Sequence, residues 1–136
     1  MLRDVMDYRE FIRTVRSRGG FASQERAEKL TATTLETIGE IVPSADKHKL
    51  IEHLPTELRS AFERPSGAQV YSLDEFFNRI AAREGATFED ARRDVLIVIS
   101  VLREAMARDE IEQLWARLPG EYRRILNPGA PPAPTL

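Results

Sequence analysis

The chain has 136 residues, of which 42% are hydrophobic and 31% are charged, and this composition predicts one compact domain or two very small ones. The net charge of −2 predicts no strong attraction to nucleic acid or to an anionic membrane. Because the sequence contains no cysteine, disulfides, thiolate catalysis and cysteine-based zinc sites are excluded. The start of the sequence lacks the apolar stretch of a signal peptide, and the longest apolar run, Val95 to Ile99, is too short to span a bilayer. We therefore expect a soluble, cytoplasmic protein without a membrane partner.

The first predicted helix covers about residues 4–18, where Phe11 and Val15 share one face at helical spacing. Gly19 and Gly20 follow, and they predict the end of this helix because a left-handed C-terminal cap favours glycine.

A second predicted helix begins after the N-cap residue Ser23 and ends before Pro43. Its inner stripe comprises Ala27, Leu30, Thr34, Leu35, Ile38 and Ile41. A third helix starts near Ser44 and ends before Pro55. Proline disfavours the helical conformation in the residue before it but fits the first turn of a new helix. The segment Leu-Pro-x-Glu-x-Arg at positions 54–59 therefore predicts a corner that leads into a fourth, short helix.

The same succession of elements returns in residues 72–126. The recurring pieces are Glu10-Phe11, Arg18-x-Gly20, Ala27 and Leu54-Pro55-x-Glu57-x-Arg59, which return as Glu75-Phe76, Arg83-x-Gly85, Ala91 and Leu118-Pro119-x-Glu121-x-Arg123. The offset is 65 residues at first and 64 from the alanine onward, which predicts a duplicated supersecondary unit. Residues 95–102 are rich in β-branched side chains and fit a buried strand as well, but their alignment with the second helix favours a helix.

These patterns predict an all-α protein, a tandem pseudo-repeat of two four-helix units packed into one helical domain. The first unit covers residues 1–64, a linker covers 65–71, and the second unit covers 72–126. Residues 127–136 contain four prolines and predict a disordered tail. Whether the two units share one core or form two small domains stays open at this point.

The Glu-Phe helix, the Arg-x-Gly turn and the Leu-Pro-x-Glu-x-Arg corner, each present twice, resemble the bacterial domain-of-unknown-function 2267 family over Tyr8 to Leu126. The resemblance implies an all-helical, stand-alone bacterial protein. It implies no reaction, cofactor or functional residue. The sequence departs from the pattern at Pro43 to Asp46, in the loop between the second and third helices.

Catalytic and metal chemistry are not expected. The two histidines, His48 and His53, lie five positions apart, which places them about 140° around a helix axis and makes one shared metal ion difficult. The chain lacks the glycine-rich and serine motifs of nucleotide-binding proteins and hydrolases. Four hydroxyl residues fit the role of N-cap better than that of nucleophile: Ser23, Ser44, Ser72 and Thr87. We therefore predict a protein that is not an enzyme and needs no cofactor or metal.

Two pairs of recurring charged residues predict ion pairs. Arg18 and Arg83 end the first helix of each unit, while Glu57 and Glu121 follow the prolines of the two corners. We expect these arginines to pair with these glutamates, within a unit or between units, and to hold the last helix to the first. A symmetric site for a small anion is the alternative.

Arg9, Arg13 and Arg16 form a basic stripe on the first helix, and such a stripe can contact phosphates. The second unit has Asp74, Asn78 and Ala81 at the corresponding positions, so the stripe is not repeated. A solvated helix face is the alternative, and nucleic-acid binding is not favoured.

Leu96, Ile97 and Val101 make the second helix of the second unit apolar almost all round. Such a helix is buried on more than one side, either in a core shared by the units or against another chain. We therefore predict a helical interaction or regulatory module that binds a protein partner or forms a homodimer. The alternatives are a nucleic-acid-associated regulator that uses the arginine stripe and a small-ligand sensor with a pocket between the units.

Overall fold

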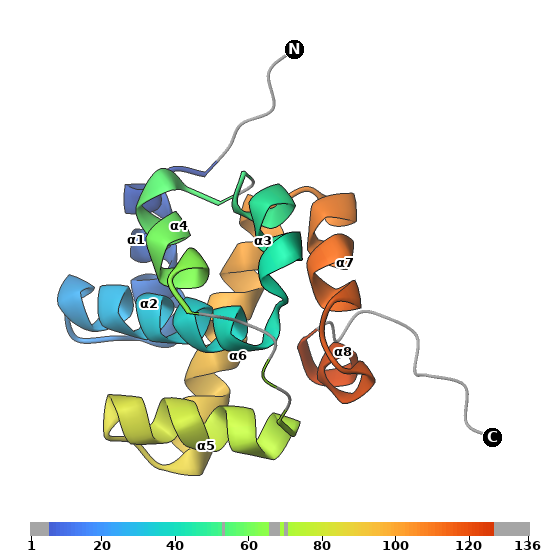
Figure 1. Cartoon of the computed structure of the whole chain (residues 1–136). Coiled ribbons are helices and arrows are strands. Elements are labelled where there is room, and N and C mark those ends of the chain that lie inside the picture. Colours follow the sequence, from blue (N-terminus) through green and yellow to red (C-terminus); the bar gives the residue numbers. More distant parts are fainter. Residues whose placement is uncertain (1–5, 53, 66–68, 70, 127–136) are drawn as a thin grey trace.

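The computed structural model describes residues 6–52, 54–65, 69 and 71–126, and within these ranges all regular structure is helical. Eight helices follow one another (Figure 1): α1 Tyr8–Gly19, α2 Gln24–Ile41, α3 Ser44–Ile51, α4 Thr56–Glu63, α5 Leu73–Glu84, α6 Phe88–Ala105, α7 Arg108–Ala116 and α8 Gly120–Leu126. The predicted all-α class is confirmed. Residues 95–102 lie inside α6, so the helical interpretation of this apolar run is also confirmed. The predicted tail, residues 127–136, lies outside the described residues.

Local capping determines where the long helices begin and end. The side chains of Ser23, Ser72 and Thr87 each accept a hydrogen bond from a backbone N–H in the first turn of α2, α5 and α6, at 3.1–3.2 Å. Gly20 and Gly85 end α1 and α5 with φ values of 67° and 64°, in the left-handed region that was predicted for them. These caps are local in sequence, which is why the sequence predicts them.

The predicted bounds of two helices need correction. Helix α1 begins at Tyr8 and not near Asp4, because the carboxylate of Asp7 accepts the N–H of Glu10 at 2.9 Å and acts as the N-cap. Helix α3 ends at Ile51, three residues before Leu54. The chain then turns at Pro55 into α4, so the predicted corner is present with a slightly longer connection.

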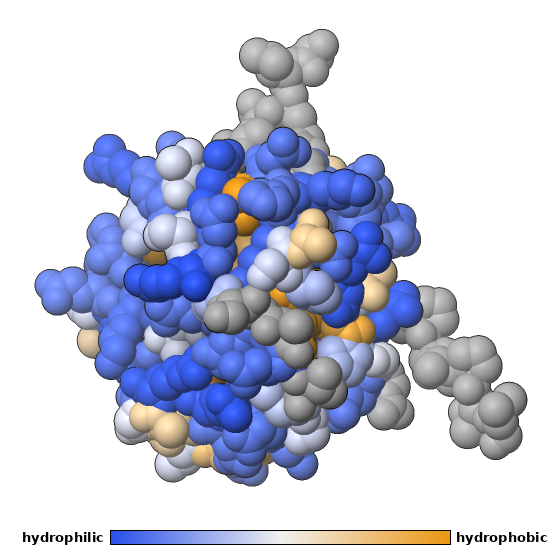
Figure 2. Space-filling model, in the orientation of Figure 1, coloured by the Kyte–Doolittle hydropathy of each residue, from blue (hydrophilic) through white to orange (hydrophobic). Residues whose placement is uncertain are grey.

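One hydrophobic core includes residues of both halves of the chain. Helix α1 packs on α2 and on α6, while α5 packs on α6 and on α2. In Figure 1, α2 crosses in front of α6, with which it is in contact. The face of the molecule seen in Figure 2 is mostly hydrophilic, with small apolar areas between the helices. The first helix of each half is thus buried partly against the second helix of the other half. That the two halves arose by duplication stays a prediction.

The last helices of the two halves pack differently. Helix α4 lies along α2, and the approach is so close at Gly39 that a Cβ atom there would be 2.3 Å from the carbonyl oxygen of Phe62. The residue 64 positions later is Arg103, whose side chain is incompatible with such an approach to α6. Helix α8 packs instead on α7 and at the start of α5, where the Tyr122 hydroxyl donates to the carbonyl of Tyr71 at 2.9 Å. The face of α6 that corresponds to the α4-covered face of α2 is therefore not covered by α8.

We expect Gly39→Ala to lower the free energy of unfolding by about 1–2 kcal/mol, because overpacking against a backbone carbonyl outweighs the better helix propensity of alanine. The measurement is thermal and urea unfolding followed by circular dichroism. Gly120→Ala is the matched control, since nothing lies within 4 Å of a Cβ atom placed there and this variant should be as stable as the parent or slightly more stable. If both variants unfold alike, close packing at Gly39 does not set the position of α4.

Candidate functional site

Two ion pairs connect the halves of the chain, but with partners other than those predicted. Arg18 binds the carboxylate of Glu104 at 2.6 Å, and Arg83 binds that of Glu40 at 2.6 Å. The expected pairing of Arg18 and Arg83 with Glu57 or Glu121 is wrong. The physical reason is that α1 and α5 end against α6 and α2 of the opposite half, far from the start of α4 and α8.

Glu57 and Glu121 lie instead near the start of the first helix of their own half. Glu121 accepts the backbone N–H of Leu73 at 3.2 Å, at the N-terminus of α5. Burial raises the pKa of Tyr8, at the start of α1, and Glu28 and then the charge of Glu57 raise it further. The expectation that these glutamates bring the last helix to the first is met for Glu121, through a helix N-terminus and not through an arginine.

The two ion pairs differ in their burial. Glu40 and Glu104 are 64 positions apart in the sequence, yet the side chain of Glu40 is 14% exposed and that of Glu104 is 52% exposed. Glu40 also accepts the hydroxyl of Tyr71 at 2.8 Å and lies 3.9 Å from Arg79, whose guanidinium stacks on the Tyr71 ring. The Glu40 carboxylate, on the side of the molecule where α2 meets α5, is thus enclosed. The Glu104 carboxylate, on the side where α1 meets α6, is open to solvent.

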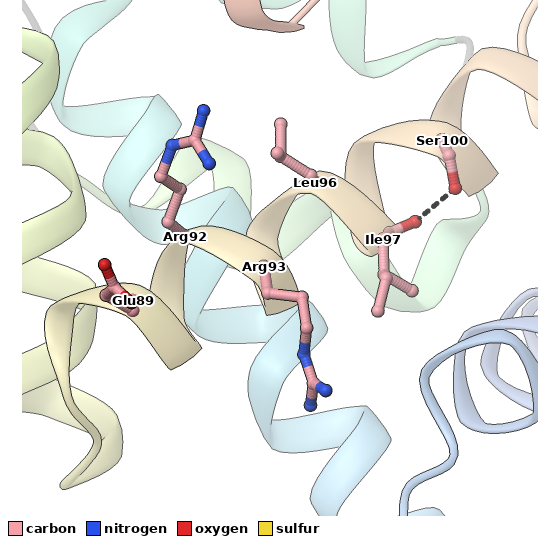
Figure 3. A pocket seen from close by; sticks show the side chains of 6 residues that line it. All are labelled: Glu89, Arg92, Arg93, Leu96, Ile97 and Ser100. Atoms are coloured by element: carbon pink, nitrogen blue, oxygen red, sulfur yellow. Dashed lines mark hydrogen bonds between the residues drawn. The ribbon is translucent and has the colours of Figure 1, made fainter.

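The open side carries two neighbouring hollows. One, of about 420 Å³, lies on the outer face of α6 and is lined by Glu89, Arg92, Arg93, Leu96, Ile97 and Ser100 (Figure 3). The other, of about 350 Å³, lies on α1 and is lined by Arg13, Thr14, Ser17 and Arg18. Arg18 belongs to the second hollow and donates a hydrogen bond to Ser100 of the first at 3.0 Å. The two hollows therefore adjoin, and we call their ten lining residues the α1–α6 surface.

The predicted partner surface is only partly exposed. Leu96 and Ile97 are partly buried and line the hollow on α6, where Figure 3 shows them on opposite sides of the helix. Val101 is fully buried and belongs to the core, so its assignment to a partner surface is wrong. Val101 lies on the inner face of α6, and this helix packs against α1, α2 and α5.

The predicted arginine stripe is also divided. Arg9, Arg13 and Arg16 are all exposed, but Arg16 donates to the carbonyls of Phe21 and Ala22 at 3.4 and 3.1 Å and so holds the turn between α1 and α2. Arg9 and Arg13 make no hydrogen bond or ion pair with other described residues. Of the stripe, only Arg13 lines a hollow.

Sequence reasoning missed the charged residues at the start of α6. Asp94 is 2% exposed, and its carboxylate lies 3.4 Å from Arg26 and 3.3 Å from Arg93. Asp94 is 64 positions after Leu30, which belongs to the predicted inner stripe of the second helix, so the alignment contained a signal for a buried carboxylate. Arg92 and Arg93 precede the longest apolar run of the chain, and this juxtaposition was the signal for a basic and apolar face.

The chemistry available on this surface is that of binding. Its side chains offer guanidinium groups, the carboxylate of Glu89, the hydroxyls of two serines and a threonine, and two aliphatic groups. The Ser100 hydroxyl is already used, since it donates to the carbonyl of Ile97 at 2.7 Å. Among the described residues, no three His, Asp or Glu side chains are placed to hold a metal ion, and none of the helices is long and apolar enough to cross a membrane.

Comparison with known proteins gives one match. The profile of a family described as "Uncharacterized conserved protein (DUF2267)" matches residues 8–125. No curated protein and no solved structure matches the chain.

We expect Arg83→Ala to destabilise the fold more than Arg18→Ala. Removal of Arg83 leaves the enclosed Glu40 carboxylate with weaker partners, at a cost of about 1–3 kcal/mol, whereas the exposed pair of Arg18 is worth less than about 1 kcal/mol. The measurement is the melting temperature of each variant, with Arg108→Ala as the control because that side chain is 93% exposed. Equal losses at Arg18 and Arg83 would contradict the role given to the burial of Glu40.

Stability should also fall at alkaline pH through Tyr71. Burial raises the pKa of Tyr71 above its ordinary value of 10.0, and the hydrogen bond to Glu40 raises it further. The folded state therefore holds this proton more tightly than the unfolded state, so the contribution is complete below pH 10 and is lost as the pH rises through the folded pKa. Tyr71→Phe should flatten the decline of the melting temperature above pH 10, and an unchanged decline would contradict this assignment.

Proposed function

Because the chain belongs to the DUF2267 family, whose description states no activity, we propose its function from the geometry: it is a non-enzymatic interaction module that binds a helix of a protein partner on the outer face of α6. The observation that carries this proposal is the difference between α2 and α6. In the first half α4 covers the outer face of α2, and in the second half α8 leaves the corresponding face of α6 uncovered.

The uncovered face has the composition of a helix-binding site. Leu96 and Ile97 lie in its middle turn, on opposite sides of the helix (Figure 3), partly buried but accessible from the hollow, and they supply the apolar area that anchors a partner helix. Arg92 and Arg93 lie one turn before them and supply a polar rim (Figure 3). This arrangement supports helix binding better than small-molecule binding, since each hollow is lined by a single helix and is open to solvent.

Nucleic-acid binding has weaker support. Of the three arginines proposed for it, Arg16 is engaged with loop carbonyls. The centre of the surface is aliphatic, and aliphatic groups make no favourable contact with phosphates. A protein partner accounts for both Leu96 and Ile97, whereas a nucleic acid leaves them uncovered.

The test begins with a photocrosslinking amino acid placed at Ile97, and at the exposed Ala82 of α5 as the control, in the full chain expressed in cells. We expect adducts at position 97 that are absent at position 82. Proteins identified in the adducts are then purified, and their affinity for the parent chain is measured by calorimetry.

In the same measurement, the variant that combines Leu96→Asp and Ile97→Asp should bind at least about tenfold more weakly, since it places charges in the apolar centre of the interface. Because both side chains also pack partly against the core, the variant should melt below the parent, and binding is compared at a temperature at which both chains are folded. Equal binding by the variant and the parent, or equal adducts at both positions, would refute the proposed function. Light scattering identifies the partner as a second copy if the mass is twice 15.5 kDa.

A further inference from the structure

We infer that the partner helix is an acidic amphipathic helix, with carboxylates on both sides of an apolar centre. This inference rests on the proposed function and specifies the chemistry of the partner. It follows from the charges that the fold leaves without partners around Leu96 and Ile97.

Three arginines around the apolar centre are unpaired. Arg13 on α1 and Arg92 and Arg103 on α6 make no hydrogen bond or ion pair with any other residue in the described ranges. Arg92 and Leu96 lie four positions apart and point to the same side of α6 in Figure 3, and Arg103 follows two turns later on the same stripe. Leu96 therefore lies between two unpaired guanidinium groups.

Two other arginines of this region are compensated within the fold. Arg18 is paired with Glu104, and Arg93 shares Asp94 with Arg26. Glu89 is the single acidic residue that lines either hollow. A chain with a net charge of −2 thus concentrates unpaired positive charge around its exposed aliphatic side chains. Complementary charge at such a rim steers association and excludes partners of the wrong sign.

The spacing of the arginines defines what the partner must present. Arg92 and Arg103 are 11 positions apart on one helix, which corresponds to roughly 16 Å along its axis. A helix lying along α6 meets this spacing with Glu or Asp residues about three turns apart and with Leu, Ile or Met between them. A second copy of this surface is a poorer occupant, because a two-fold contact brings arginines toward arginines.

The test is a selection from a displayed library of helices about as long as the 18-residue α6. The central positions hold Leu, Ile or Met, and the flanking positions hold Glu, Lys, Gln or Ser at random. The library is selected on the full chain alone, and the enriched helices are then measured on the variant with Leu96→Asp and Ile97→Asp. We expect Glu to exceed Lys at the flanking positions, and affinity measured by fluorescence anisotropy to fall as salt rises.

Charge-reversal variants distinguish electrostatic attraction from non-specific binding. Arg92→Glu combined with Arg103→Glu should weaken binding of the selected acidic helices by at least about tenfold and favour a twin peptide with Lys in place of Glu. Arg108→Glu, on the exposed side of α7, is the matched control and should leave both affinities unchanged.

The outcomes distinguish the two levels of the proposal. Selected helices that are neutral or basic, or that ignore the reversal, overturn the acidic partner while the helix-binding function stands. Helices that bind the variant with Leu96→Asp and Ile97→Asp as well as they bind the parent, or a library that yields none, overturn both. Tight binding of a duplex oligonucleotide by the parent that is lost in Arg13→Glu also overturns the inference, in favour of nucleic acid.

Discussion

The fold depends on the burial of each half's first helix against the second helix of the other half. Helices α1 and α5 present apolar faces that a single helix pair cannot cover, and α6 and α2 of the opposite half complete the cover. Arg18 with Glu104 and Arg83 with Glu40 lie at the ends of these contacts and connect the same pairs of helices. The core of either half is therefore incomplete without the other half.

What the sequence predicts well is what short stretches of chain determine. The caps at Ser23, Ser72 and Thr87 and the glycine stops follow from hydrogen bonds within a few residues. The apolar periodicity gives the inner faces of the long helices. The partners of Arg18 and Arg83 depend on which helices cross, and a helix pattern carries no information on crossing. Which side of α6 is exposed could not be predicted either, because it depends on the helices that pack on the opposite side, where Val101 lies.

The candidate surface arises from a small difference between the halves. Gly39 allows α4 to lie against the backbone of α2. Arg103 occupies the corresponding position of α6, and its side chain prevents α8 from lying against α6 in the same way. One half therefore closes its outer face with its own last helix and the other leaves it accessible. The polar contacts differ between the halves in the same way: Glu40 is enclosed and bonded by Tyr71, whereas Glu104 is exposed.

The ion pair of Arg18 with Glu104 spans 86 positions of the chain, and this has a consequence for synthesis on the ribosome. Helix α1 emerges before the helix that completes its burial, and at their ion pair the two helices are 86 positions apart. Until then Phe11 and Val15 lack part of their final cover. Contacts this distant in sequence slow folding, because the chain between them must first be closed into a loop. Apolar surface that waits for its cover in this way is open to aggregation and to chaperones while the first half stands alone.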